Sequence, residues 1–549
     1  MKKAVKKKIV TAVAFASACV LGVSIAAAYG ERNVVAENWT ENVAAVVENV
    51  EMDGGYKKTT RSYVQAKSNE DVGYTEGLAY NYVVVTDEDY KVVDEYYVLR
   101  SIGKSEDTDI IIPKYIQISE DIKIPVREIH PFAFKGNLDI KSVVIPNTVE
   151  VIGADAFNGC KNLEKVEMPT TLGIRKDEDK KLLDGVIEER AFANCGALTE
   201  ITIPSNVKAI SNDTFNMCAA LETVSLHNNI ETIGENAFAR CSSLKKIAIP
   251  EKVEMVSEGA FYYCTALQSV EFSESVTRIR KRAFAGCSSL TEVELPKPKG
   301  KDATLTVDKY AFAYCDNLES VTISEKTESI ADYAFAACKN LKSFTVAKKN
   351  VVYQAIDGDL YTIEQKTLKQ YALGKADKDV VVASDVLVIA DGAFATANNI
   401  ESVTLEEGVK VIGDDAFFGC ANLVSVTLCD GLMAIGESAF RNCNALEMLV
   451  ISIPKAPDVF DVGEDKKVID MGIYNYAFRW CENLTSIYVK GDYKSWKLKV
   501  NLGLLTGVED LEVYYYSEEF EVGCWYYDED GKPTIVVEDM PEDIPAENE

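Results

Sequence analysis

The sequence predicts an α/β-type repeat solenoid of about 23 residues per coil, with a parallel β-sheet on its concave face. Three observations carry this prediction: a recurring Ala-Phe pair, a strand pattern that follows each pair, and apolar residues at fixed distances from each phenylalanine. One unit of this kind cannot bury its own apolar face, whereas stacked units form a continuous core. The 549 residues are therefore expected to form one array rather than several separate domains.

The repeat is set by a phenylalanine preceded by alanine, or once by threonine, that recurs thirteen times. Eight of the twelve gaps between successive copies are 23 residues, so the longer gaps are expected to contain insertions. We place these insertions at residues 170–186, 297–306, 347–388 and 452–472. The thirteen residues are Phe134, Phe157, Phe192, Phe215, Phe238, Phe261, Phe284, Phe312, Phe335, Phe394, Phe417, Phe440 and Phe478.

Each unit also contains a short strand pattern. Ile or Val stands five residues before the phenylalanine, Leu or Ile six after it, and two apolar residues follow at offsets nine and eleven, as in Val224 and Leu226. The pattern Leu-x2-Val-x-Ile alternates inward and outward side chains and is the strand signature of leucine-rich repeats. Similar segments at 109–113, 379–382 and 508–513 predict further strands of the same array.

The unit Ala-Phe-x2-Cys-x2-Leu-x2-Val-x-Ile-Pro resembles the BspA-like bacterial surface leucine-rich repeat proteins. Segments Asp357–Tyr361 and Tyr371–Lys375 are similar to the hairpin insert of that family, and Tyr514–Gly531 is similar to its closing segment. The resemblance covers roughly residues 96–536. It implies an exported, cell-surface, mostly non-enzymatic protein, in some cases an adhesin, and it implies no particular ligand.

The amino terminus predicts export. Five lysines within residues 2–8 precede an apolar run over 9–28 that ends in three alanines, which is typical of a signal peptide cleaved after Ala28. The apolar run is close to the length of about 20 residues that spans a bilayer, so an uncleaved N-terminal anchor is the alternative. In both cases the bulk of the chain is expected to be extracellular, either secreted or at the cell surface.

The remaining segments complete the predicted domain organisation. Residues 29–95 show no repeat and are expected to form an N-terminal stalk or cap, because the exposed end of a solenoid needs covering. The solenoid with its insertions is placed at 96–516. Residues 517–549 are expected to form a closing segment and an acidic tail.

Composition argues against several functions. The 58 basic and 87 acidic residues give a formal net charge of −29, which repels phosphate backbones and disfavours a nucleic-acid partner. The two histidines, His130 and His227, lie in repeat positions without a nucleophile motif nearby. No sequence motif indicates a metal or cofactor site. The sequence thus predicts no enzyme, no cofactor and no metal.

Eleven of the fourteen cysteines occupy the same repeat position, three residues after the phenylalanine. Stacked coils would bring them close enough for disulfides, but Asn137 and Ala397 replace cysteine in two copies. This favours buried reduced thiols over obligatory bridges.

The predicted function is binding of a protein or glycan macromolecule at the cell surface, as an adhesin or recognition protein. Outward strand positions are mostly Ser and Thr and lack the Trp, Tyr and Arg typical of binding hot spots. The candidate partner contacts are Tyr353, Tyr361 and Tyr371 in the largest insertion, although these side chains could instead form the core of the hairpin. The alternatives are a structural spacer or scaffold at the cell envelope and, less favoured, a surface hydrolase.

Overall fold

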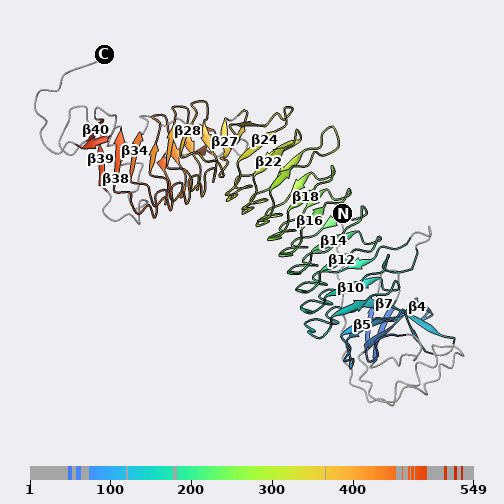
Figure 1. The fold of residues 1–549 in the computed structure, drawn as a ribbon. Helices are drawn as coiled ribbons and strands as arrows, with labels where there is room; N and C mark the ends of the chain where they lie inside the picture. Colours follow the sequence, from blue (N-terminus) through green and yellow to red (C-terminus); the bar gives the residue numbers. More distant parts are fainter. Residues whose placement is uncertain are drawn as a thin grey trace, which may run out of the picture. The chain divides into compact units, whose positions relative to one another are not determined.

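The computed structural model describes residues 47–51, 57–63, 73–118, 121–176, 182–364, 366–452, 460–461, 468–469, 472–474, 476–490, 512–515, 525–527 and 533–535. The predicted export signal lies outside these residues. The chain divides into two compact units, residues 1–245 with 250–253 and residues 246–249 with 254–549. Each unit consists of short strands joined by turns (Figure 1).

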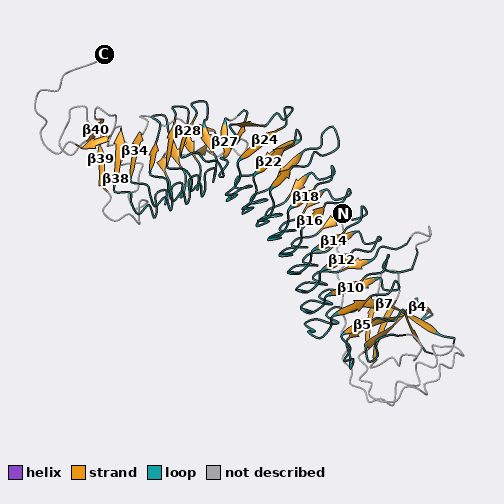
Figure 2. Ribbon diagram, viewed as in Figure 1, coloured by secondary structure: helices purple, strands orange, loops and turns teal. Residues whose placement is uncertain are grey.

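The fold is a β-solenoid of about 14 turns with about 23 residues per turn, and its strands are parallel. The described residues contain no helix, so the α/β class expected from the sequence is not confirmed (Figure 2). The segment around the repeat phenylalanine is a six-residue turn in place of the helix that an α/β class implies, as at residues 309–314. Tyr310 and Tyr314 in this turn have φ values of 62° and 59°. An α-helix cannot continue through such left-handed residues, so the segment stays a turn.

A first ladder of parallel strands follows the phenylalanine turns. In the first unit it contains β5 (Asp109–Ile111), β8 (Ser142–Val144), β10 (Lys165–Glu167), β12 (Glu200–Thr202) and β14 (Thr223–Ser225). In the second unit it contains β16 (Lys246–Ala248), β18 (Ser269–Glu271), β20 (Glu292–Glu294), β22 (Ser320–Ile323), β24 (Ser343–Val346), β28 (Asp379–Val382), β30 (Ser402–Leu405), β32 (Ser425–Thr427), β34 (Met448–Ser452), β38 (Ser486–Lys490) and β39 (Glu512–Tyr515). Strands β5, β28 and β39 confirm the three additional strands expected from the sequence.

A second ladder of shorter strands precedes the turns. In the first unit it contains β9 (Val151–Ile152), β11 (Val186–Ile187), β13 (Ala209–Ile210) and β15 (Thr232–Ile233). In the second unit it contains β17 (Met255–Val256), β19 (Arg278–Ile279), β21 (Leu305–Val307), β23 (Thr327–Ile330), β29 (Val388–Ile389), β31 (Val411–Ile412), β33 (Ala434–Ile435) and β37 (Gly472–Ile473).

Antiparallel strands begin the first unit. Strands β1 (Val47–Glu51), β2 (Lys57–Tyr63), β3 (Ala79–Thr86) and β4 (Val92–Ser101) pair in sequence order. Strand β4 then pairs in parallel with β7 (Lys123–Ile129), which also pairs with β9 and with β6 (Tyr115–Gln117). This sheet supplies hydrogen-bond partners to the first short strands, whose edge groups would otherwise be left unpaired.

The largest insertion of the second unit adds a hairpin and a further coil. Strands β25 (Tyr353–Ile356), β26 (Asp359–Thr362) and β27 (Thr367–Gln370) pair antiparallel, and β27 then pairs in parallel with β29. Two smaller antiparallel pairs are β35 (Phe460–Asp461) with β36 (Val468–Ile469) and β40 (Trp525–Tyr527) with β41 (Pro533–Ile535). The hairpin expected from the family resemblance is therefore present.

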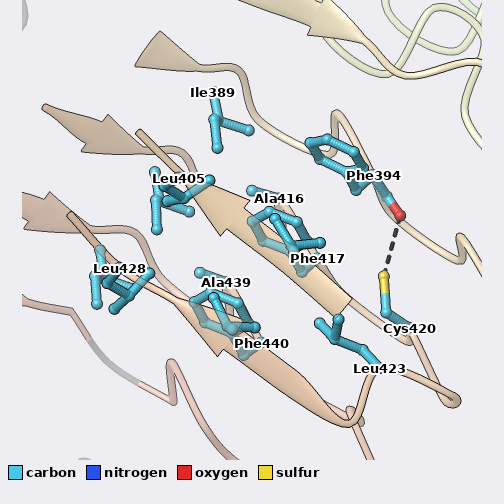
Figure 3. Close-up of a cluster of buried hydrophobic side chains, with 14 of the residues drawn as sticks. Ile389, Phe394, Leu405, Ala416, Phe417, Cys420, Leu423, Leu428, Ala439 and Phe440 are labelled. Carbon is cyan, nitrogen blue, oxygen red and sulfur yellow. Dashed lines mark hydrogen bonds between the residues drawn. The ribbon is translucent and has the colours of Figure 1, made fainter. Parts of the chain in front are cut away.

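The core of each unit is a column of stacked phenylalanine rings. All thirteen repeat phenylalanines are at most 2% exposed. In the second unit the ring centroids of Phe394 and Phe417 are 4.7 Å apart, and those of Phe417 and Phe440 are 4.9 Å apart with planes at 3° (Figure 3). Leucines such as Leu423 pack beside the rings. The isoleucines five residues before these phenylalanines, such as Ile389, belong to the same core. The buried, stacked rings expected from the sequence are confirmed, and in the second unit they form two runs, Phe261 to Phe335 and Tyr371 to Phe478.

Candidate binding surface

The outward face of the first strand ladder carries hydroxyl groups in columns. Ser320 pairs in register with Ser343, and Thr322 with Thr345. The same arrangement recurs between β30 and β32. Short hydroxyl side chains stabilise neighbouring strands and offer little apolar area, so this face lacks the residues that anchor a tightly bound partner.

A different set of side chains occupies the phenylalanine turns of the second unit. We call this surface the turn face: the side chains from three residues before to two residues after each repeat phenylalanine of that unit. It presents aromatic rings to solvent, with Tyr314 54% exposed, Tyr263 43%, and Tyr476 and Trp480 39% each. Exposed apolar side chains that gather in one patch mark candidate interaction sites.

One group on the turn face, the tyrosine cluster, contains Tyr262, Tyr263, Arg282, Lys309, Tyr310 and Tyr333. The rings of Tyr262 and Tyr263 meet edge to face at 4.5 Å. The ammonium of Lys309 lies 4.2 Å from the ring centroid of Tyr333 and 5.2 Å from that of Tyr310. Each such cation–π contact contributes about 0.5–1 kcal/mol at an exposed site, and here it also fixes the position of the cation.

The tyrosine cluster is held in place by contacts with later coils. The hydroxyl of Tyr333 donates hydrogen bonds to the main-chain oxygen of Asp414 at 3.1 Å and to the carboxylate of Asp415 at 3.0 Å. A Cβ atom added at Gly392 would lie 2.4 Å from the Tyr333 ring, so only glycine leaves room for it. Burial raises the pKa of Asp415, while the Tyr333 hydrogen bond and the charge of Arg441 oppose that rise. Tyr333 is thus a support for the cluster rather than an exposed contact.

The second group, the arginine–tryptophan cluster, contains Phe418, Arg441, Tyr476, Arg479 and Trp480. The guanidinium carbons of Arg441 and Arg479 lie 4.2 and 4.4 Å from the centroid of the Trp480 ring. Arg441 also lies 5.9 Å from the Phe418 ring, and Arg479 lies 4.9 Å from the Tyr476 ring. Three successive coils therefore place two guanidinium groups on one shared aromatic surface.

The tyrosines expected from the sequence to contact a partner are placed differently. Tyr353 is 5% exposed, and its hydroxyl oxygen accepts a hydrogen bond of 2.7 Å from the Ile330 amide. Tyr371 is fully buried and stacks on Phe394 at 4.8 Å, so it fills the ring position of the additional coil. Only Tyr361 is partly exposed. The hairpin uses Tyr353 and Tyr371 for its attachment to the solenoid.

Tyr361 lines a small surface pocket between the hairpin and the coil that follows it. The pocket is lined by Gln354, Ile356, Tyr361, Thr362, Lys366, Ala383, Asp385 and Val386. Burial and the neighbouring carboxylates raise the pKa of Tyr361, so its phenol stays protonated. The pocket has no group with the activated character expected of a nucleophile or general base.

Close to this pocket, a buried ion pair attaches the hairpin. The carboxylate of Asp359 accepts hydrogen bonds from the Ala372 amide at 2.8 Å and from the Lys375 ammonium at 3.1 Å. Burial raises the pKa of Asp359 to about 6, although both donors act in the opposite direction. Its contacts are structural, because both oxygens bind groups of the turn that carries Tyr371.

The histidines also have structural contacts. Ring nitrogen Nε2 of His227 lies 2.8 Å from the oxygen of Pro204, and Nδ1 accepts a hydrogen bond from the Asn229 amide. His130 contacts the oxygen of Pro131 at 2.6 Å. Among the residues that the structure describes, no group of three or more His, Cys, Asp or Glu side chains is placed to hold a metal ion. The described part of the chain also lacks a helix that could span a membrane.

The turn face was missed by the sequence analysis, although a signal for it is present. Aligning the units on phenylalanine places Tyr263, Tyr314 and Trp480 at the same offset of two residues. The strand positions alternate regularly in every unit, so they are recognised easily. Aromatic residues at the turn offsets occur in only some coils.

The comparisons with known proteins agree with the repeat architecture. The family model described as BspA type leucine rich repeat region matches in six copies, over residues 120–178, 185–304, 305–356 and 362–459. The chain belongs to the BspA-type leucine-rich repeat family. This confirms the resemblance seen in the repeat unit.

Solved structures similar to this BspA-type chain are bacterial leucine-rich repeat proteins. A leucine rich cell surface protein from Faecalibacterium prausnitzii is 24% identical, with 82% of this chain and 97% of that one covered and a TM-score of 0.46. A leucine-rich repeat protein from Bacteroides ovatus is 21% identical, with 83% and 99% covered and a TM-score of 0.47. The pneumococcal vaccine antigen PcpA is 17% identical, with 86% and 94% covered and a TM-score of 0.35. No curated protein matches the chain.

Proposed function

We propose that this BspA-type protein is exported, remains at the cell surface or is secreted, and binds a macromolecular partner there without catalysing a reaction. Its role would be that of an adhesin or recognition protein. The observation that carries the proposal is the turn face, where Tyr263, Tyr314 and Trp480 are exposed and two arginines stack on the Trp480 ring. Trp, Tyr and Arg are the residues that most often dominate binding energy at protein interfaces.

The repeat architecture supports recognition over a long surface. Each described turn adds one set of side chains to the turn face, and the buried ring column holds successive sets in fixed register. Such a surface is preorganised, so little side-chain entropy is lost when a partner binds. A large partner would contact several coils at once.

A structural spacer, the main alternative, needs no exposed rings. On a surface without a binding role, the three exposed side chains Tyr314, Tyr476 and Trp480 would add aggregation risk without benefit. Three tyrosines of the largest insertion were predicted to contact a partner: Tyr353, Tyr361 and Tyr371. Only Tyr361 is partly exposed, so only Tyr361 is part of this proposal.

The test measures binding of the full chain to immobilised host-matrix, mucus and bacterial-surface fractions. The variant Tyr263→Ala/Tyr314→Ala/Trp480→Ala removes three exposed rings and leaves the buried column intact. Loss of saturable binding by at least about tenfold in the variant supports recognition through the turn face. Equal binding by both proteins would contradict it, and the absence of saturable binding by the wild-type chain would favour a spacer. A deletion of 347–388 is unsuitable, because it would remove the coil that contains Tyr371.

A further inference from the structure

We infer that the arginine–tryptophan cluster binds an acidic polypeptide segment, with Arg441 and Arg479 contacting carboxylates and Trp480 contacting an adjoining apolar side chain. This inference rests on the proposed function and names the class of partner for one part of the turn face. Three features of the cluster support this inference: the positions of the two guanidinium groups, the charges around them and the exposure of the aromatic rings.

The two guanidinium groups are held close together by the coil register. Arg441 and Arg479 each follow a repeat phenylalanine by one residue, on coils whose rings Phe440 and Phe478 stack at 5.3 Å. Both lie over the same Trp480 ring, at 4.2 and 4.4 Å from its centroid. Two like charges beside one ring repel each other, and an acidic segment that pairs with both would offset that repulsion.

The described part of the chain does not supply that anion. No described carboxylate forms an ion pair with either guanidinium, and the charge of Arg441 acts on Asp415 only by opposing the rise of the Asp415 pKa. The Asp415 carboxylate instead accepts a hydrogen bond from Tyr333 at 3.0 Å. Nε of Arg441 is buried without a hydrogen-bond partner among the described groups, so stacking on aromatic rings positions its guanidinium.

Stacked guanidinium groups keep their N–H edges available. Arginine can stack on an aromatic face and at the same time donate two parallel hydrogen bonds to a carboxylate. Tyr476 and Trp480, each 39% exposed, provide apolar area beside these donors. Carboxylates next to an apolar or aromatic side chain would satisfy both parts of the cluster.

The two arginines favour an acidic partner at this cluster, whereas the negative net charge of the chain disfavours an acidic partner elsewhere. The chain has a formal net charge of −29, so an acidic segment is repelled by most of the protein. At this cluster two arginines lie over one ring, and no ion pair with a described carboxylate neutralises either of them. Complementary charges of this kind fix orientation and speed association. We favour a polypeptide over an anionic glycan because Trp, Tyr and Arg together are the composition of protein–protein hot spots.

The experiment measures binding of four polymers to the full chain by surface plasmon resonance at low and moderate salt. The probes are random poly(Glu,Tyr), poly-L-glutamate, poly-L-lysine and polygalacturonate. Poly(Glu,Tyr) should bind tightest, poly-L-glutamate several-fold more weakly, and binding should weaken as salt rises. Arg441→Ala/Arg479→Ala should reduce the affinity for poly(Glu,Tyr) by at least about tenfold. Trp480→Ala should remove the preference for poly(Glu,Tyr) over poly-L-glutamate.

The matched control is Arg240→Ala/Lys339→Ala, which removes the same charge from exposed positions outside the cluster. Its affinity for poly(Glu,Tyr) should equal that of the wild type, and thermal melting should show that all variants remain folded. An equal loss of affinity in the control variant would show that the effect depends on net charge alone, and it would overturn the inference. Polygalacturonate binding as tight as that of poly(Glu,Tyr), with the same loss in the arginine variant, would assign a glycan instead. Either result leaves the broader proposal standing if the immobilised fractions still bind through the turn face.

Discussion

The Sγ atom of Cys420 donates a hydrogen bond of 3.2 Å to the main-chain oxygen of Phe394, one coil earlier in the chain (Figure 3). Equivalent bonds join nine more repeat cysteines to the preceding ring residue, at 3.0–3.4 Å. The twelve described cysteines are buried and form no disulfide, as the sequence analysis favoured. The thiol is therefore more than a small apolar group, because it gives each phenylalanine carbonyl a second donor.

One of the two coils that lack a cysteine shows how this donor can be replaced. Ala397 occupies the cysteine position next to the ring residue Tyr371. The side-chain amide of Gln370 donates to the Tyr371 oxygen at 3.1 Å and to the Ala393 oxygen at 3.0 Å. A glutamine thus supplies the donor that the alanine cannot.

This substitution of donors predicts a rescue. Gln370→Ala should lower the free energy of unfolding by about 1–3 kcal/mol, because two buried carbonyl groups lose a partner. Adding Ala397→Cys should recover part of the loss, since a thiol at that position is placed to donate to the Tyr371 oxygen. Urea unfolding of the two single variants and the double variant gives the coupling energy. Strict additivity of the two changes would show that the donors are not equivalent.

The same burial predicts unreactive thiols. Burial raises the pKa of Cys160 and of Cys218 to about 12, although main-chain hydrogen bonds act in the opposite direction. A thiol reagent at about pH 8 should leave the twelve described cysteines unlabelled in the native protein, since only a thiolate reacts. After denaturation all should be labelled, as measured by mass spectrometry of the individual peptides. Rapid native labelling of Cys420 would mean that the ring column opens readily.

Much of this fold could be predicted from the sequence because the ring column depends on regular spacing. Every repeat phenylalanine lies where its offset placed it, and so do leucines such as Leu423. The absent helix could not be predicted in this way. Hydrogen bonds between coils, such as that from the Phe312 amide to the Ala334 oxygen, hold these turns. Tyr310 and Trp480 carry no local signal for their positive φ, although other coils have Gly, Asn or Asp at the same offsets, such as Asp155 and Gly419.

The candidate site was less predictable. Tyr371 lies 23 residues before Phe394, but it follows glutamine instead of alanine, so its ring position was not recognised. The bond between Tyr333 and Asp415 joins residues 82 apart in the sequence. Contacts over such separations depend on how coils stack, which the spacing of a single unit does not contain.

Asp155 provides a test of stability in the first unit. Its buried carboxylate accepts hydrogen bonds from Arg190 at 3.1 Å, Asn158 at 2.6 Å and Lys135 at 3.2 Å. Burial alone would raise the pKa of Asp155, but these three donors outweigh it and lower the pKa below the ordinary value. Asp155→Ala should therefore lower the free energy of unfolding by about 1–3 kcal/mol near pH 7.

The sign of the pH dependence follows from that lowered pKa. A carboxyl with a depressed folded-state pKa stabilises the fold above its unfolded value of 3.8, and the contribution is lost as the pH falls. The difference between the wild type and Asp155→Ala should shrink as the pH drops below about 4. Glu325→Ala is the control, because Glu325 is partly exposed and forms an ion pair with the exposed Lys297, so its removal should have little effect. A constant difference across the range would show that shape rather than charge is responsible.

Asp359 should show the opposite dependence. Its pKa is raised by burial from 3.8 to about 6, so the folded state binds more protons than the unfolded state between these two values. The stability contribution of Asp359 is then fully present below about pH 4 and falls as the pH rises through about 6. The wild type should lose up to roughly 3 kcal/mol relative to Asp359→Asn over this range. Lys375→Met removes a group that lowers the pKa of Asp359, so the midpoint should move to higher pH. Urea unfolding at a series of pH values measures both effects, and parallel curves for the wild type and Asp359→Asn would show that the Asp359 carboxylate is already solvated in the native hairpin.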